Sequence, residues 1–139
     1  MHVASICARS LSTCHRDTSV AELARRMRDA HVGEITVVEN QGERICPVGV
    51  VTDRDIVVRV IAAGLDPEHT PAGDLLVGAC ETVLDTEMVY DAIWHMRGKR
   101  LHCLPVVDRH GALMGLLRSD DVSEFLASEL MEVSRIEPH

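Results

Sequence analysis

The chain has 139 residues, of which 46% are hydrophobic, and a formal net charge of −8 at pH 7. This length fits one compact domain or two small units that share a core, and the apolar content excludes a largely disordered chain. The acidic balance excludes extended contact with a nucleic-acid backbone, because such contact needs many lysines and arginines. No stretch approaches the roughly 18 apolar residues of a membrane helix, and no apolar signal segment is recognisable. We therefore expect a cytoplasmic protein that binds neither nucleic acid nor membrane.

The cysteines and histidines do not form a recognisable chemical motif. The five cysteines are odd in number and include no C-x-x-C pair, which favours reduced thiols. The eight histidines are scattered, so no metal site is predicted. No nucleophile paired with a base and no phosphate-binding glycine loop is visible, and we therefore predict no catalytic residues, no catalytic cofactor and no enzymatic activity.

The first predicted elements are a short strand entry at Thr13 and a helix. The apolar face of this helix is formed by residues at helical spacing, namely Val20, Leu23, Ala24 and Met27. The period then changes to short β-branched runs, "EITVVE" and "VGVV", which flank a turn containing Gly42 and predict a hairpin. A second helix, "RDIVVRVIAAG", follows Asp53 and is ended by Gly64 and Pro67.

The same order of elements returns in the second half of the chain. Without a gap, Thr13 aligns with Thr82, Val20 with Val89, Met27 with Met96, Ile35 with Leu104, and Val37-Val38 with Val106-Val107. Gly49 and Asp55 then align with Gly115 and Asp121, after a hairpin loop that is longer in the first copy. The chain is therefore an internal duplication.

One copy of this size is marginal alone, because too little of its surface can be buried. Two copies, each with helices on one side of a sheet, can bury the other side against each other. We predict an α/β fold of two β-α-β-β-α repeats packed sheet to sheet with pseudo-twofold symmetry and a cleft on each side of the seam. The predicted boundaries are 1–66 for the first repeat, 67–71 for a linker and 72–139 for the second repeat.

Thr52 and Asp55 have two compatible interpretations. A threonine three residues before an acid is typical of a capping box, which satisfies amides at a helix start. The same helix start presents N–H groups to an anion, and a carboxylate in the first turn can accept hydrogen bonds from ribose hydroxyls. Spacing alone favours capping and leaves ligand binding open.

These motifs together resemble the tandem cystathionine-beta-synthase (CBS) domain pair, or Bateman module. The resemblance covers nearly the whole chain. It rests on the strand entry from Thr13 to Val20, the "LPVV" run from Leu104, the Gly-x-x-Thr-x-x-Asp signature from Gly49 to Asp55, and the duplication. It implies a stand-alone regulatory module that binds an adenosine-containing ligand, such as AMP, ATP, NAD or S-adenosylmethionine, with AMP or ATP preferred.

The resemblance also implies which residues form the two clefts. In the first, Asp55 takes the ribose hydroxyls, Thr52 contacts ribose or phosphate, and the remaining wall comprises Ser12, Val32, Gly33 and Val50. In the second, the equivalent positions are Leu101, His102, Cys103, Leu116 and Asp121, with Glu81 in the place of Ser12.

Arg118 departs from the pattern, because a long cation stands where the first repeat has the short hydroxyl of Thr52. Two outcomes are open. Arg118 fills or blocks the second cleft, or it turns toward a ligand phosphate, which its planar guanidinium suits.

Apolar surface predicts a partner. The segment "IVVRVIAAG" is apolar almost all round, which predicts a homodimer that packs these helices across a twofold axis. Tyr90 and Trp94 share one flank of a helix and are either a contact surface or the edge of the core. The alternative function is accordingly a protein-interaction module with empty clefts, whose regulated partner the sequence does not identify.

Overall fold

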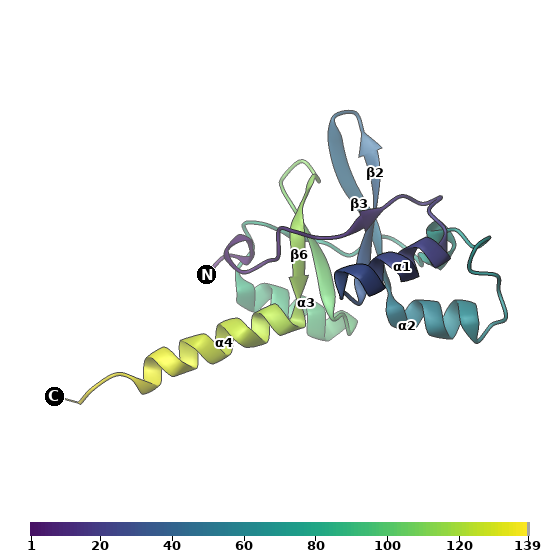
Figure 1. Cartoon of the computed structure of the whole chain (residues 1–139). Coiled ribbons are helices and arrows are strands. Elements are labelled where there is room, and N and C mark those ends of the chain that lie inside the picture. Colours follow the sequence, from purple (N-terminus) through teal and green to yellow (C-terminus); the bar gives the residue numbers. More distant parts are fainter. Residues whose placement is uncertain (139) are drawn as a thin grey trace.

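The computed structural model, which describes residues 1–138, contains two α/β halves with the same order of elements (Figure 1). The first half comprises η1 (Val3–Ser5), β1 (Thr13–Cys14), α1 (Val20–Ala30), β2 (Glu34–Gln41), β3 (Arg44–Thr52) and α2 (Asp53–Ile56), which continues as a π-helical segment, η2 (Val57–Ile61). The second half comprises η3 (Ala72–Leu75), β4 (Val83–Leu84), α3 (Val89–Lys99), β5 (Cys103–Val107), β6 (Leu113–Arg118) and α4 (Ser119–Ser134). The predicted fold class and repeat are confirmed.

Over the described residues the strands form two three-stranded sheets, β1-β2-β3 and β4-β5-β6. In each sheet a short first strand runs parallel to the second, and the second and third form an antiparallel hairpin. Both hairpins carry a bulge at the equivalent place, Val37/Val38 and Val106/Val107. The duplication therefore extends to irregularities of the backbone.

The helix α1 is capped by Ser19, whose hydroxyl accepts the amide hydrogen of Glu22 at 3.2 Å. Val20, Leu23 and Met27 are buried on its inner face, as predicted. Ala24 was expected on that face but is exposed. Ala21 is buried instead, because the linker lies on the first turn and the carbonyl of Pro67 accepts the Ala21 amide hydrogen.

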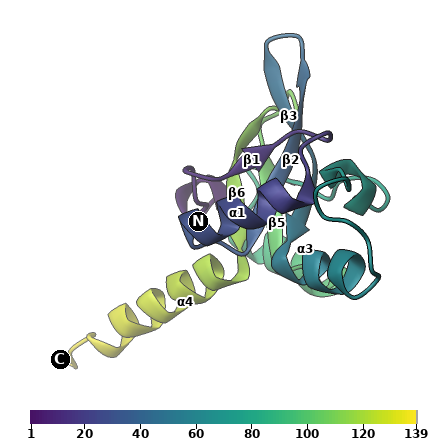
Figure 2. The same ribbon diagram turned by 45° about the vertical axis from the view of Figure 1, so that its right-hand side comes forward.

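Each half has its own apolar core, and each core is completed by a segment from the other half. Val3 of η1 is fully buried in the core of the second half. Ala72 and Leu75 of η3, the equivalent segment, are buried in the core of the first half. Figures 1 and 2 show the N-terminal segment on the side of the second half. The two leading segments are therefore exchanged between the halves.

The inner faces of the two sheets meet at the seam. Along β2, Ile35 and Val37 belong to the helix-covered core, so Thr36 and Val38 lie on the opposite face. The strand β3 contacts both β5 and β6 of the second sheet. The predicted sheet-to-sheet packing is thereby confirmed.

No helix within residues 1–138 has both the length and the apolar character that crossing a membrane requires.

We expect the substitution Gly115→Ala in β6 to destabilise the protein. An added Cβ would lie 2.6 Å from the carbonyl oxygen of Ala8, which belongs to the backbone and cannot rotate aside. Overpacking of this kind costs about 1–3 kcal/mol, so Gly115→Ala should reduce the free energy of unfolding, measured in urea, by that amount. Gly98 in α3 is the control, because an added Cβ meets no described atom within 4 Å and alanine favours a helix by about 0.5–1 kcal/mol. Equal stability of the two variants would contradict the packing of Ala8 against β6.

Candidate functional site

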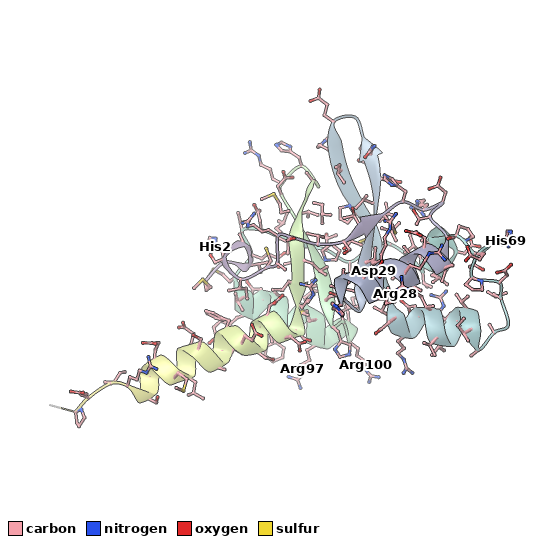
Figure 3. The ribbon with its side chains drawn as sticks, in the orientation of Figure 1. His2, Arg28, Asp29, His69, Arg97 and Arg100 are labelled. Carbon is pink, nitrogen blue, oxygen red and sulfur yellow. The ribbon has the colours of Figure 1, made fainter. Side chains whose placement is uncertain are left out.

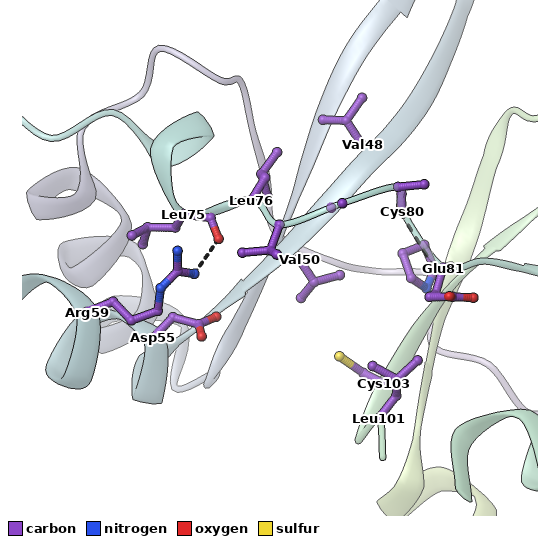
Figure 4. Close-up of a pocket in the computed structure, with 15 residues that line it drawn as sticks. Val48, Val50, Asp55, Arg59, Leu75, Leu76, Cys80, Glu81, Leu101 and Cys103 are labelled. Atoms are coloured by element: carbon purple, nitrogen blue, oxygen red, sulfur yellow. Dashed lines mark hydrogen bonds between the residues drawn. The ribbon is translucent and has the colours of Figure 1, made fainter. Parts of the chain in front are cut away.

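A cleft of about 280 Å³ opens where the two halves meet (Figure 4). Val50 of β3 and Asp55 of α2 line it from the first half. Leu101, Cys103 and Glu81 line it from the second half. Its volume is near the lower end of the range for small-molecule sites, about 300–1,000 Å³. We refer to this cavity as the first cleft.

Asp55 is positioned by the start of α2. The Thr52 hydroxyl accepts the Asp55 amide hydrogen at 3.2 Å, and the Asp55 carboxylate accepts the Thr52 amide hydrogen at 2.9 Å. This reciprocal pair is the predicted capping box. It occupies one carboxylate oxygen and holds the half-buried group at the cleft wall, where the other oxygen can accept hydrogen bonds. The Thr52 side chain is a cap and does not line the first cleft.

Arg59 is a lining residue that the sequence did not reveal. It lies one helical turn beyond Asp55, and its guanidinium donates to the carbonyl oxygen of Leu75 (Figure 4). The sequence could have indicated Arg59, because it follows Asp55 by four residues and so lies on the same face of the helix. Five N–H donors on the guanidinium give this cleft a cation suited to an oxyanion.

Cys103 is partly buried between charged groups of both halves. Burial above all, together with the carboxylates of Glu34 and Asp55, raises the pKa of its thiol to about 11, against the opposing effect of Arg118. The thiol is therefore neutral at physiological pH. Cys103 thus lines the first cleft and also lies within electrostatic reach of Glu34 and Arg118.

The structure groups the predicted residues across the halves rather than within them. Leu101, Cys103 and Glu81, expected beside Asp121, lie instead with Asp55 and Val50. The reason is the sheet-to-sheet packing, which places β5 opposite the end of β3.

Ser12 is separated from Asp55. It lines a different, shallow hollow with Thr13, Arg26 and Asp29. Gly33 lies against the side chain of Asp53, and neither Gly33 nor Val32 lines the first cleft. These three residues were predicted to complete the wall around Asp55, and the structure does not place them in the first cleft.

His102 does not line the first cleft. It directly precedes β5 and lines a groove of about 450 Å³ between α3 and α4. Ile93, Met96 and Val122 give this groove apolar walls. Figure 3 shows Arg97 and Arg100 projecting outward at its edge.

Arg118 pairs with Glu34 of the first half. Its guanidinium also lies 4.0 Å from the carboxylate of Asp121, which accepts the Arg118 amide hydrogen at 3.1 Å. Leu116, expected on the base of a ligand, is 1% exposed and exchanges two backbone hydrogen bonds with Ala8. Leu116, Arg118 and Asp121 correspond to Val50, Thr52 and Asp55 of the first half, and we refer to their site as the second cleft.

All five cysteines are free thiols. Among residues 1–138, no group of three or more His, Cys, Asp or Glu side chains is placed to hold a metal ion.

The chain belongs to the CBS domain family, since residues 3–62 and 72–128 each match the CBS domain. The uncharacterized protein YlbB of Bacillus subtilis is 34% identical over 113 residues, which cover 81% of this chain and 74% of YlbB. The uncharacterized protein MK0525 of Methanopyrus kandleri is 29% identical over 120 residues, which cover 86% of this chain and 60% of MK0525. The CBS domain protein PAE2072 from Pyrobaculum aerophilum, solved with AMP, has a TM-score of 0.81 and 26% identity, covering 98% of this chain and 100% of that chain. The resemblance to a CBS domain pair is confirmed.

We expect Cys103 to react slowly and with a steep pH dependence. Only the thiolate reacts, so a thiol with a pKa of about 11 gains reactivity about tenfold per pH unit between pH 8 and pH 10. Iodoacetamide labelling followed by peptide mass spectrometry measures this rate, and Cys103→Ser identifies the peptide. Free cysteine, with a pKa of about 8.5, is the reference and levels off above pH 9. A rate for Cys103 that levels off with the reference would show that its thiol is exposed.

Proposed function

We propose that this CBS domain pair is a regulatory module that binds an adenosine-containing ligand in the first cleft. The observation that carries this proposal is the Asp55 carboxylate, held at a helix start and facing a cavity built from both halves. A carboxylate with an available oxygen suits the paired hydroxyls of a ribose. Val50, Leu101 and Pro105 offer aliphatic walls for a base. The AMP complex of the P. aerophilum protein supports this ligand class.

Arg59 supports a phosphate on the ligand. Its guanidinium lines the same cleft as Asp55, and one of its amino groups holds the Leu75 carbonyl. Its remaining N–H donors can reach an oxyanion without disturbing that bond. AMP and ATP are therefore the ligands we favour within the class.

The helical surface supports a homodimer. Val57, Val58 and Ile61 of η2 are 59%, 48% and 57% exposed. Three neighbouring aliphatic side chains on one short segment form a surface that association would bury. In this proposal ligand binding regulates the protein by favouring one arrangement of the dimer over another, to the extent that the two differ in affinity.

A second function, docking of another protein, is favoured by two exposed rings of α3. Tyr90 is 70% exposed and Trp94 is 64% exposed, with the guanidinium of Arg97 5.3 Å from the indole centre. Aromatic and arginine side chains are common anchors of interfaces. Such docking does not need the first cleft, so it is distinguished by its indifference to Asp55.

Asp55→Asn should weaken AMP binding. The variant keeps an oxygen for the Thr52 amide and loses the charge, and hydrogen bonds to a charged group contribute about 1.5–3 kcal/mol. Isothermal titration should therefore give a Kd about 10- to 150-fold higher than wild type. Asp121→Asn is the matched control, because it makes the same change at the equivalent helix start, and it should bind AMP as wild type does. An unchanged Kd for Asp55→Asn would contradict the proposed ribose site.

The pair of substitutions Val57→Glu and Ile61→Glu should convert a dimer into monomers. Burying carboxylates in an apolar interface is strongly unfavourable, and both side chains lie on the exposed surface of η2. Sedimentation velocity measures the change. Val77→Glu, at an 80% exposed position outside η2, is the control and should remain dimeric. A monomeric wild type, or a dimer that tolerates both glutamates, would argue against this interface.

A further inference from the structure

The two clefts have equivalent backbones and different charges. The position of Thr52 is taken by Arg118 in the second half, and the position of Cys103 is taken by Glu34 in the first half. A capping hydroxyl beside the first cleft and a neutral thiol in its wall therefore correspond to a guanidinium and a carboxylate at the second.

Those two charges are bound to each other. The Arg118 Nε group donates to a carboxylate oxygen of Glu34, and the two side chains are 24% and 18% exposed. Breaking a largely buried pair by removing one partner leaves a charge without compensation, which is costly. The pair therefore stays closed in the resting protein and lies beside Asp121, the equivalent of Asp55.

The other end of the second cleft is covered by backbone. Ala8 donates to and accepts from Leu116 at 2.9 Å in each direction, and Leu116 is 1% exposed. Val50, the equivalent residue, is half-buried and lines the first cleft. The place of a ligand base is thus open in one half and filled in the other.

Thr36 supplies a buried polar group on the strand that carries Glu34. Its side chain is fully buried, and among the described residues its Oγ1 has no hydrogen-bond partner. It lies on the same face of β2 as Glu34, two residues along the strand. A buried hydroxyl without a partner is unfavourable and calls for an explanation. The explanation we adopt is that Thr36 belongs to the wall of a ligand site that is covered in this structure.

We propose that the second cleft is an adenosine-ligand site closed by the Arg118–Glu34 pair, so that each chain binds one ligand. This inference rests on the proposed function of the first cleft. The pair takes the place of the ligand beside Asp121, and its removal restores binding of the same ligand class.

The test replaces the two charged residues of the second cleft with the residue types found at the equivalent positions of the first. The double variant Arg118→Thr, Glu34→Cys should bind two AMP per chain in isothermal titration, against one for wild type. The second AMP should bind about 5- to 150-fold more weakly than the first, because it must displace the two hydrogen bonds between Ala8 and Leu116. Arg118→Lys is the control, since it keeps a cation opposite Glu34, and it should bind one AMP.

The reciprocal variant, Thr52→Arg with Cys103→Glu, should bind no AMP, because it places the closing pair in the first cleft. Circular dichroism melting establishes that each variant is folded, and the reciprocal variant decides the matter if the first does not fold. Two AMP per wild-type chain, one AMP on the folded opening variant, or one AMP on the folded reciprocal variant would each overturn the inference while leaving the first cleft as a site. A wild type that binds no AMP would overturn the proposed function and this inference with it.

Discussion

The exchange of leading segments between the halves is the constraint on which the rest of the structure depends. Val3 completes the second core, and Ala72 and Leu75 complete the first. A half of about sixty residues is only marginally stable alone, so each half gains stability from the other's segment. Residues 76–81 follow η3 directly, and the exchange therefore lays them along the seam, where Leu76 and Glu81 line the first cleft.

The two halves share the same backbone features but differ in the side chains at their ligand clefts. Bulges, left-handed helix ends at His31 and Arg100, and hairpin register recur in both halves. The side chains at the equivalent helix starts do not recur, since a threonine caps α2 and an arginine precedes α4. A duplicated fold can keep its packing with one set of residues and change its ligand sites with another, because the core and the cleft walls lie on opposite faces of the same strands.

Charge at the seam is arranged so that it is compensated or solvated. Glu34 meets Arg118, and Arg59 is held by the Leu75 carbonyl beside Asp55. Uncompensated charges at such a depth would destabilise the packed halves. The Cys103 thiol, which lines the first cleft within electrostatic reach of Glu34, Arg118 and Asp55, is neutral and adds no further charge.

The amino-acid sequence by itself determined the elements, their duplication and the capping box of Thr52 and Asp55. These features depend on residues that are close along the chain, where hydrophobic period and turn chemistry act. Tertiary structure decided which residues share a cleft. Arg118 meets a partner 84 residues away, Ser12 is separated from Asp55, and Leu101 and Cys103 cross to the first cleft. Spacing within a repeat cannot reveal this, because the clefts form only when two sheets pack face to face and leading segments are exchanged.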